Sequence, residues 1–185
     1  MVEKIESWNG LEARIIDNLV AEKTPISEEE IGQLQKFMDD VLKASNNRTY
    51  SQKILESLPY ALRQDRMAHT YAVLLYETDP DSDSKKIGGC GFLNDWKPGG
   101  FEGGRWEVRC MYIHPDHQKK GMGKRILKQL EDVARAKELK QIELEAVNLP
   151  GTVKFYERNG WKIVKEYQKQ IGECPVPLTH MSKEL

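Results

Sequence analysis

One stretch of the chain constrains the fold more than any other, because the hydrophobic pattern changes there from strand to helix and back. Residues 105–113 have the pattern of a β-strand, residues 121–139 that of an amphipathic helix, and residues 141–147 that of a second strand. A strand, a helix and a strand in this order imply a right-handed crossover between two parallel strands. We therefore expect a parallel strand pair with a long helix packed across it.

Further helices and strands are predicted on both sides of this unit. Ser27, with Glu30 three residues later, forms a capping box that begins the first helix. Helical periodicity, β-branched runs and turn residues together predict helices at 27–44, 51–64 and 152–158 and strands at 70–78, 86–96, 161–168 and 176–181. The predicted fold class is α/β (α+β), with a mixed central sheet and helices on both of its faces.

The composition predicts one globular domain, residues 1–185, and excludes several classes of partner. The chain has 39% hydrophobic and 31% charged residues, and no apolar run approaches the length that spans a bilayer. Its formal net charge of −1 gives no general basic field for nucleic acid or an anionic membrane. The first residues lack the basic and apolar regions of a secretory signal, so we expect a cytoplasmic protein.

The cysteines and histidines predict neither a metal site nor a catalytic thiol. Cys90, Cys110 and Cys174 are an odd number without C-x-x-C spacing, so buried free thiols are the better interpretation. The four histidines are scattered along the chain without the close spacing of zinc ligands. We expect no metal, and we expect Cys110 to pack in the interior rather than to carry an acyl group.

The segment His114 to Lys124 joins the predicted strand to the predicted helix and has the features of an anion-binding turn. Two glycines allow close approach of the backbone, and unpaired N–H groups at a helix start favour a bound pyrophosphate. A dinucleotide fingerprint would need a third glycine at Ile126, and a Walker loop would need Ser or Thr at Arg125. Both of these nucleotide-binding motifs are therefore excluded.

The remaining pattern, Gln118-x-x-Gly121-x-Gly123 after a strand, resembles the acetyl-CoA motif of the GNAT superfamily of N-acetyltransferases. The order of elements and the run from Phe155 to Trp161 extend the resemblance over most of the chain. It implies the GNAT fold, with a splayed parallel strand pair around the cofactor, and acetyl-CoA as co-substrate.

The resemblance also implies which residues hold acetyl-CoA. The pyrophosphate would lie on the turn, and the backbone of the preceding strand would pair with the pantetheine arm. Asn148 would contribute a further contact, although it stands eight residues before Tyr156 where family members often have seven. The implied cofactor residues are Met111, Tyr112, Ile113, Gln118, Lys119, Lys120, Gly121, Met122, Gly123, Lys124 and Asn148.

Two residues are candidates for proton transfer. Tyr156 matches the family tyrosine that protonates the departing thiolate, and Glu107 resembles the general-base glutamate of the histone-acetylating branch. On an alternating strand, Glu107 would share a face with Arg109, Met111 and Ile113, and Cys110 would point to the opposite face. Competing bases, acting through water, are Glu145, Asp39, Glu56 and Asp65.

The expected function is transfer of an acetyl group from acetyl-CoA to a primary amine by direct attack in a ternary complex. The acceptor can be a small-molecule amine or a protein or peptide amine, because one scaffold serves both. The alternative is an acyl-CoA-binding module or sensor without turnover. Exposed strand edges near the C-terminus could pair two copies into a homodimer.

Overall fold

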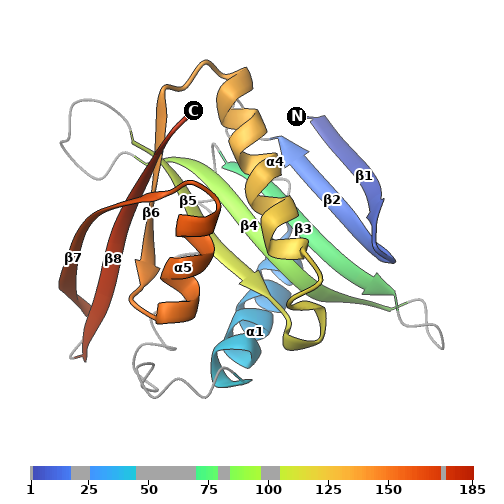
Figure 1. Cartoon of the computed structure of the whole chain (residues 1–185). Helices are drawn as coiled ribbons and strands as arrows, with labels where there is room; N and C mark the ends of the chain where they lie inside the picture. The colour runs from blue at the N-terminus through green and yellow to red at the C-terminus, as the bar shows by residue number, and fades with distance from the viewer. Residues whose placement is uncertain (1, 18–25, 45–69, 79–83, 97–104, 172–173) are drawn as a thin grey trace.

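A computed structural model describes residues 2–17, 26–44, 70–78, 84–96, 105–171 and 174–185. In these residues the structure has one eight-stranded mixed sheet in the order β1-β2-β3-β4-β5-β6-β8-β7 (Figure 1). The strands are β1 (Val2–Trp8), β2 (Leu11–Asp17), β3 (Thr70–Thr78), β4 (Lys85–Trp96), β5 (Arg105–Ile113), β6 (Gln141–Val147), β7 (Lys162–Ile171) and β8 (Cys174–Glu184). The helices are α1 (Glu28–Ala44), α4 (Met122–Ala136), α5 (Pro150–Arg158) and the 3₁₀ turn η2 (Pro115–His117).

Most of the predicted elements are present, and one hairpin was missed. Strands β1 and β2 pair antiparallel around Asn9 and Gly10, whose φ angles are 50° and 84°. Asn-Gly is the preferred dipeptide for a two-residue hairpin turn with two positive φ angles, so the turn residues carried a signal for this hairpin. The predicted helix at 51–64 and the glycine-rich connection at 97–104 lie outside the described residues.

Helices cover both faces of the sheet, as predicted. Helix α4 packs on strands β3, β4 and β5 through its apolar stripe, and α5 continues this layer over β6 and β7. Helix α1 covers the opposite face over β4 and β5. Ile126, Leu127 and Leu130 of α4 are fully buried, and each such side chain contributes about 1.5–3 kcal/mol to folding.

The only parallel neighbours among the described strands, β5 and β6, diverge soon after they meet. Their register contains two pairs, Glu107 with Glu143 and Val108 with Leu144, although the strands continue to Ile113 and Val147. Beyond Val108 the two strands no longer pair. The strand pair is therefore splayed, as the resemblance implied.

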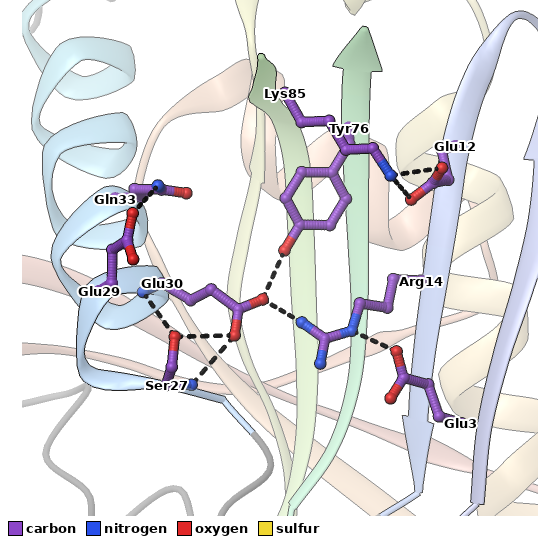
Figure 2. A network of polar contacts seen from close by, with 9 residues as sticks. All are labelled: Glu3, Glu12, Arg14, Ser27, Glu29, Glu30, Gln33, Tyr76 and Lys85. Carbon is purple, nitrogen blue, oxygen red and sulfur yellow. Dashed lines mark hydrogen bonds and ion pairs between the residues drawn. The ribbon is translucent and has the colours of Figure 1, made fainter. Parts of the chain in front are cut away.

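A polar network ties the start of α1 to the sheet beneath it (Figure 2). The Glu30 carboxylate accepts hydrogen bonds from the Ser27 N–H at 3.0 Å and the Tyr76 hydroxyl at 3.1 Å, and it forms an ion pair with Arg14. Arg14 also bonds Glu3 at 2.6 Å. Burial acts to raise the pKa of Glu30, but the Ser27 N–H and the charge of Arg14 outweigh it and lower that pKa. The predicted capping box is thus confirmed as part of a larger network.

Substituting Glu30 by glutamine should destabilise the fold by about 1–2 kcal/mol at pH 7, because it removes a cap and an ion pair together. A lowered folded-state pKa gives stability that is present above the ordinary value of 4.5 and is lost as the pH falls through the folded pKa. Urea unfolding should therefore show a difference between wild type and variant that shrinks below about pH 4.

Glu29→Gln is the matched control for this prediction, because Glu29 lies in the same turn of α1 and contacts Gln33 at 3.4 Å. It should leave stability within about 0.5 kcal/mol of wild type. Equal destabilisation by the two variants would show that the network adds nothing beyond the helix-terminal charge.

Candidate functional site

The turn between β5 and α4 is anchored to the sheet at several points. The His114 N–H donates to the Gly88 carbonyl at 2.9 Å, and the His117 ring lies against Gly88 so closely that a Cβ there would be 2.9 Å from its Cδ2 atom. The Gln118 side chain donates from Nε2 to the Ile113 carbonyl at 3.0 Å. These contacts fix the turn at the end of β5, where the strands have separated.

The backbone of this turn opens the start of α4 to solvent. Lys119 and Gly121 have φ angles of 59° and 81°, and Gly121 is the N-terminal cap residue of α4. The N–H groups of Met122, Gly123 and Lys124 have no intrahelical acceptor, because they lie in the first turn of the helix. Gly121 has no side chain that could accept from them, so the helix start has no side-chain cap. A Cβ at Gly121 would meet no atom within 4 Å. Unpaired donors, open space and the positive helix end together suit a phosphate group.

The side chains of this turn divide between solvent and core. Gln118, Lys119, Lys120 and Lys124 are exposed, whereas Met122 is buried in the core under α4. The structure thus brings the predicted pyrophosphate residues into one turn. Met122 can contribute only its backbone N–H there, because its side chain packs inward.

A β-bulge interrupts β5 just after the parallel register ends. Arg109 pairs with Phe92 and Tyr112 with Cys90, so Cys110 and Met111 together oppose Gly91, and Cys110 has a φ of 48°. Such a bulge shifts the alternation of side chains by one residue. A Cβ at Gly91 would lie 2.5 Å from Cγ2 of Ile126, so only glycine permits α4 to approach here.

The bulge overturns the predicted face of Glu107. Val108, Met111 and Ile113 all pack in the core under α4, whereas Cys110 and Tyr112 pack against the cluster under α1. Glu107 therefore lies on the α1 side of the sheet, with Cys110 and not with Met111 and Ile113. The prediction assumed unbroken alternation, and the extra residue at Cys110 breaks it.

Tyr156 lies on α5, which packs over β6 on the α4 side of the sheet, and we refer to the separated ends of β5 and β6 beyond Val108 and Leu144 as the gap. Its ring is 7% exposed and packs edge to face on Phe155 and Trp161, at 5.1 and 5.9 Å between centroids. Burial, and then the nearby Cys110 thiol, raise the pKa of Tyr156 well above its usual range. The phenol is therefore protonated at neutral pH and can act as a proton donor.

Glu107 is partly buried on the α1 side, with 18% of its side chain exposed and the Arg109 Nε atom 3.8 Å from Oε2. Burial raises the pKa of Glu107, Arg109 opposes the shift, and the negative charges of Glu145 and Glu143 add to it. In its deprotonated form Glu107 is a stronger proton acceptor than an exposed carboxylate, because its pKa is raised.

Two residues beside Glu107 were missed in the sequence. Glu143 is its register partner on β6, and His180 of β8 lies 2.9 Å from Glu143 Oε2 through its Nε2 atom. Glu145, a predicted alternative base, is engaged by Lys169 at 2.6 Å and by the Tyr167 hydroxyl. Burial acts to raise the pKa of Glu145, but these hydrogen bonds outweigh it and lower that pKa. Glu145 is thus a weaker proton acceptor than Glu107.

The remaining predicted residues contact other parts of the fold or lie outside the described residues. The Asn148 side chain donates to Glu166 on β7 at 2.9 Å. Asp39 forms an ion pair with Lys43 on α1, and Glu56 and Asp65 lie outside the described residues. Cys90 is fully buried and Cys110 partly buried, and both are free thiols.

No three or more histidine, cysteine, aspartate or glutamate side chains in the described part of the chain gather in a way that could hold a metal ion. No helix in the same residues is long and apolar enough to cross a membrane.

A curated relative, the L-amino acid N-acyltransferase MnaT of Escherichia coli (strain K12), is 38% identical over 66 residues, which are 35% of this chain and 34% of that protein. The match thus spans about a third of the relative's length.

Solved structures share the fold at low sequence identity. PaiA N-acetyltransferase of Thermoplasma acidophilum, in complex with coenzyme A, has a TM-score of 0.62 at 17% identity, over 94% of this chain and 99% of that one. YncA of Salmonella typhimurium, with its cofactor acetyl-CoA, has a TM-score of 0.60 at 16% identity, over 95% and 94%. The profile of the acetyltransferase (GNAT) family matches residues 38–161. This chain, with its splayed strand pair and open helix start, belongs to the acetyltransferase (GNAT) family.

Proposed function

We propose that the chain is an acetyl-CoA-dependent N-acetyltransferase that transfers the acetyl group directly to a primary amine. One observation carries this proposal. Tyr156 lies in the core cluster under α4 and α5, and Glu107 lies on the α1 side of β5, in the last pairs before β5 and β6 separate. A proton donor and a proton acceptor thus lie on opposite faces of the sheet near the splayed strand pair, and direct transfer uses one group of each kind.

The residues present fit acetyl-CoA. The open N–H groups at the start of α4 and the space above Gly121 suit the pyrophosphate, with Gln118, Lys119, Lys120 and Lys124 around it. The backbone of Met111, Tyr112 and Ile113 borders the gap and would hold the pantetheine arm. PaiA and YncA, solved with coenzyme A and acetyl-CoA, have the same fold and support this assignment. Acetyl-CoA would supply the activated acetyl group as a thioester.

The protein's own groups have separate tasks in this mechanism. Glu107 takes a proton from the acceptor ammonium, so that the nitrogen can attack. A backbone N–H at the bulge, near Met111, stabilises the negative charge that develops on the carbonyl oxygen. Tyr156 donates its proton to the departing sulfur. The attacking nitrogen releases its excess proton to solvent as the amide forms, and solvent returns a proton to Tyr156. No covalent enzyme intermediate is needed.

Glu107→Gln should lower kcat at pH 7 by about 100-fold or more, because the carboxylate no longer accepts the proton. Since the base form is the deprotonated one, wild-type activity should rise with pH through the raised pKa of Glu107. The variant should lose this rise, which forms the acidic limb of the pH profile. Its activity should recover partly at alkaline pH, where the amine is already deprotonated. The measurement is kcat from pH 4 to 10, a range that begins below the ordinary carboxyl pKa of 4.5.

Glu145→Gln is the matched comparison, because Glu145 lies on the next strand and was an alternative base. It should keep the acidic limb and most of the activity at pH 7. Loss of that limb in Glu145→Gln, with a wild-type profile in Glu107→Gln, would assign the base to Glu145 instead.

The competing function is an acyl-CoA-binding module without turnover, and thiol release decides between the two. Acetyl-CoA is incubated with the protein and, in turn, with an L-amino acid, a peptide with a free N-terminal amine, a lysine-containing peptide blocked at its N-terminus, and a polyamine. The first of these is included because the relative MnaT is named for L-amino acids. Amine-dependent thiol release with matching N-acetyl product supports the enzyme, and binding without release supports the module.

A further inference from the structure

Glu143 lies on β6 between a carboxylate on one neighbouring strand and a histidine on the other. On the β5 side its register partner is Glu107, and on the β8 side the Nε2 atom of His180 lies 2.9 Å from its Oε2 atom. Leu144 packs in the core under α4, so Glu143 points to the α1 face, where Glu107 also lies. Met181 packs in the same core, so His180 points to the α1 face as well. The Glu143 carboxylate thus has a neighbour on each side, and it contacts His180.

Contact of Glu143 with Glu107 instead would impair a proton acceptor. Register partners on neighbouring strands lie about 5 Å apart, so their side chains can reach each other. Two carboxylates in contact do not both ionise readily, and they titrate as a coupled pair. The negative charge of Glu143 already contributes to the raised pKa of Glu107. A closer approach would keep Glu107 protonated over more of the pH range, and a protonated carboxyl cannot accept a proton.

His180 is placed to prevent this contact. Its side chain is buried, with 9% exposed, whereas 20% of the Glu143 side chain is exposed. An ionised carboxylate only accepts hydrogen bonds, so Nε2 of His180 carries the proton in this contact. Glu145, the register partner of His180 on β6, is bound by Lys169 at 2.6 Å and therefore has a donor of its own. The fixed imidazole thus draws the Glu143 carboxylate towards β8.

The other elements around Glu107 bring few charges to it. Helix α1, which covers β4 and β5, packs through buried apolar residues. On β4 the register partner of Glu107 is the uncharged Asn94. Besides Glu143, the groups that interact electrostatically with Glu107 are Arg109 and Cys110 on its own strand, Glu145 on β6 and Lys169 on β7. Glu145 and Lys169 are paired with each other, so Glu143 is the like charge whose position His180 sets.

We propose that His180 is a positioning residue for the proposed reaction. It holds the Glu143 carboxylate towards β8, so that Glu107 can ionise and take the proton from the acceptor ammonium. This inference rests on the proposed function, because it concerns the base of that reaction.

His180→Phe should move the titration midpoint of Glu107 up by about one pH unit, because the released Glu143 carboxylate can then approach it. The change keeps a planar ring but removes the donor. His180→Gln should restore most of the wild-type behaviour, since its amide can still donate to Glu143. The measurement is carbon-13 NMR titration of the glutamate carboxyl groups in the full chain, with Glu107→Gln to assign the signal. It requires neither co-substrate nor acceptor.

Glu143→Gln decides whether His180 acts through Glu143. Alone, this variant should move the titration of Glu107 to lower pH, because it removes a like charge. In this background His180→Phe should have almost no further effect. Equal shifts by His180→Phe in both backgrounds would show that His180 acts through the fold as a whole, and would overturn the inference.

The acidic limb of kcat should follow the same order. It is measured with acetyl-CoA and the best acceptor among the four amines tested for thiol release. In His180→Phe the limb should lie about one pH unit higher than in wild type, which corresponds to roughly tenfold lower activity at a pH on the limb. A merely structural role would lower kcat at every pH without moving the limb, and that outcome would contradict the inference.

Lys165→Gln is the matched control, because Lys165 is the register partner of His180 on β7 and its Nζ atom lies over the Tyr167 ring. It removes a cation next to His180 and should leave the Glu107 titration unchanged. An equal shift in this control would show a general effect of charge and would contradict the inference. An unchanged Glu107 titration in His180→Phe would overturn it and leave the proposed function standing. Absence of turnover with every amine would refute the proposed function, while the carboxyl titration would still decide whether His180 holds Glu143 away from Glu107.

Discussion

Gly121→Asp should weaken binding of acetyl-CoA by roughly 30-fold or more, since a carboxylate beside the pyrophosphate costs about 2 kcal/mol or more. The position has a φ of 81° and open space around its Cα atom, so the new side chain would occupy the volume that suits the phosphates. Aspartate tolerates this backbone region better than most residues and is favoured at a helix start, so α4 should still form. The readout is the Kd for acetyl-CoA from equilibrium dialysis, with KM where turnover is measurable.

Gly121→Asn separates the effect of charge from that of size. Asparagine has nearly the same volume and also tolerates a positive φ, but it adds no negative charge. It should weaken binding much less than aspartate does. If both variants bind acetyl-CoA as wild type does while remaining folded, the pyrophosphate does not lie at this helix start.

Tyr156→Phe should lower kcat by about 100-fold or more while leaving KM for acetyl-CoA nearly unchanged. Only the hydroxyl is removed, so the ring contacts with Phe155 and Trp161 persist. Because burial raises the pKa of Tyr156, the phenol should remain protonated in alkaline solution where an exposed tyrosine ionises. Wild-type activity should therefore show no alkaline decline that belongs to this residue below about pH 10.

Thermal unfolding distinguishes a catalytic loss from a structural one in this variant. A melting temperature close to that of wild type, together with the loss of kcat, supports the acid role. Unchanged kcat would remove Tyr156 from the mechanism, and water would then be the proton donor to sulfur.

Much of the fold could be predicted because local patterns agree with the final packing. The apolar stripe of α4 and the capping box at Ser27 and Glu30 depend on near neighbours in sequence, and both are found as expected. The turn with Gly121 also follows from residues that lie next to one another. The hairpin β1–β2 could have been predicted from Asn9-Gly10 in the same way.

Other features depend on contacts between distant parts of the chain. The bulge at Cys110 arises opposite Gly91, where α4 comes so close to β4 that no side chain fits. Nothing in the sequence of β5 alone marks the extra residue, so Glu107 was assigned to the wrong face. The Glu143–His180 pair likewise requires that β8 insert between β6 and β7, which periodicity does not reveal.

The most direct test of the acetyl-CoA site is a calorimetric titration of the wild-type chain with acetyl-CoA, without any amine present. We predict saturable binding at one site per chain, with a matching rise in melting temperature as the ligand concentration increases. A folded protein that gives no binding heat and no thermal stabilisation at millimolar acetyl-CoA would contradict the proposed acetyltransferase activity.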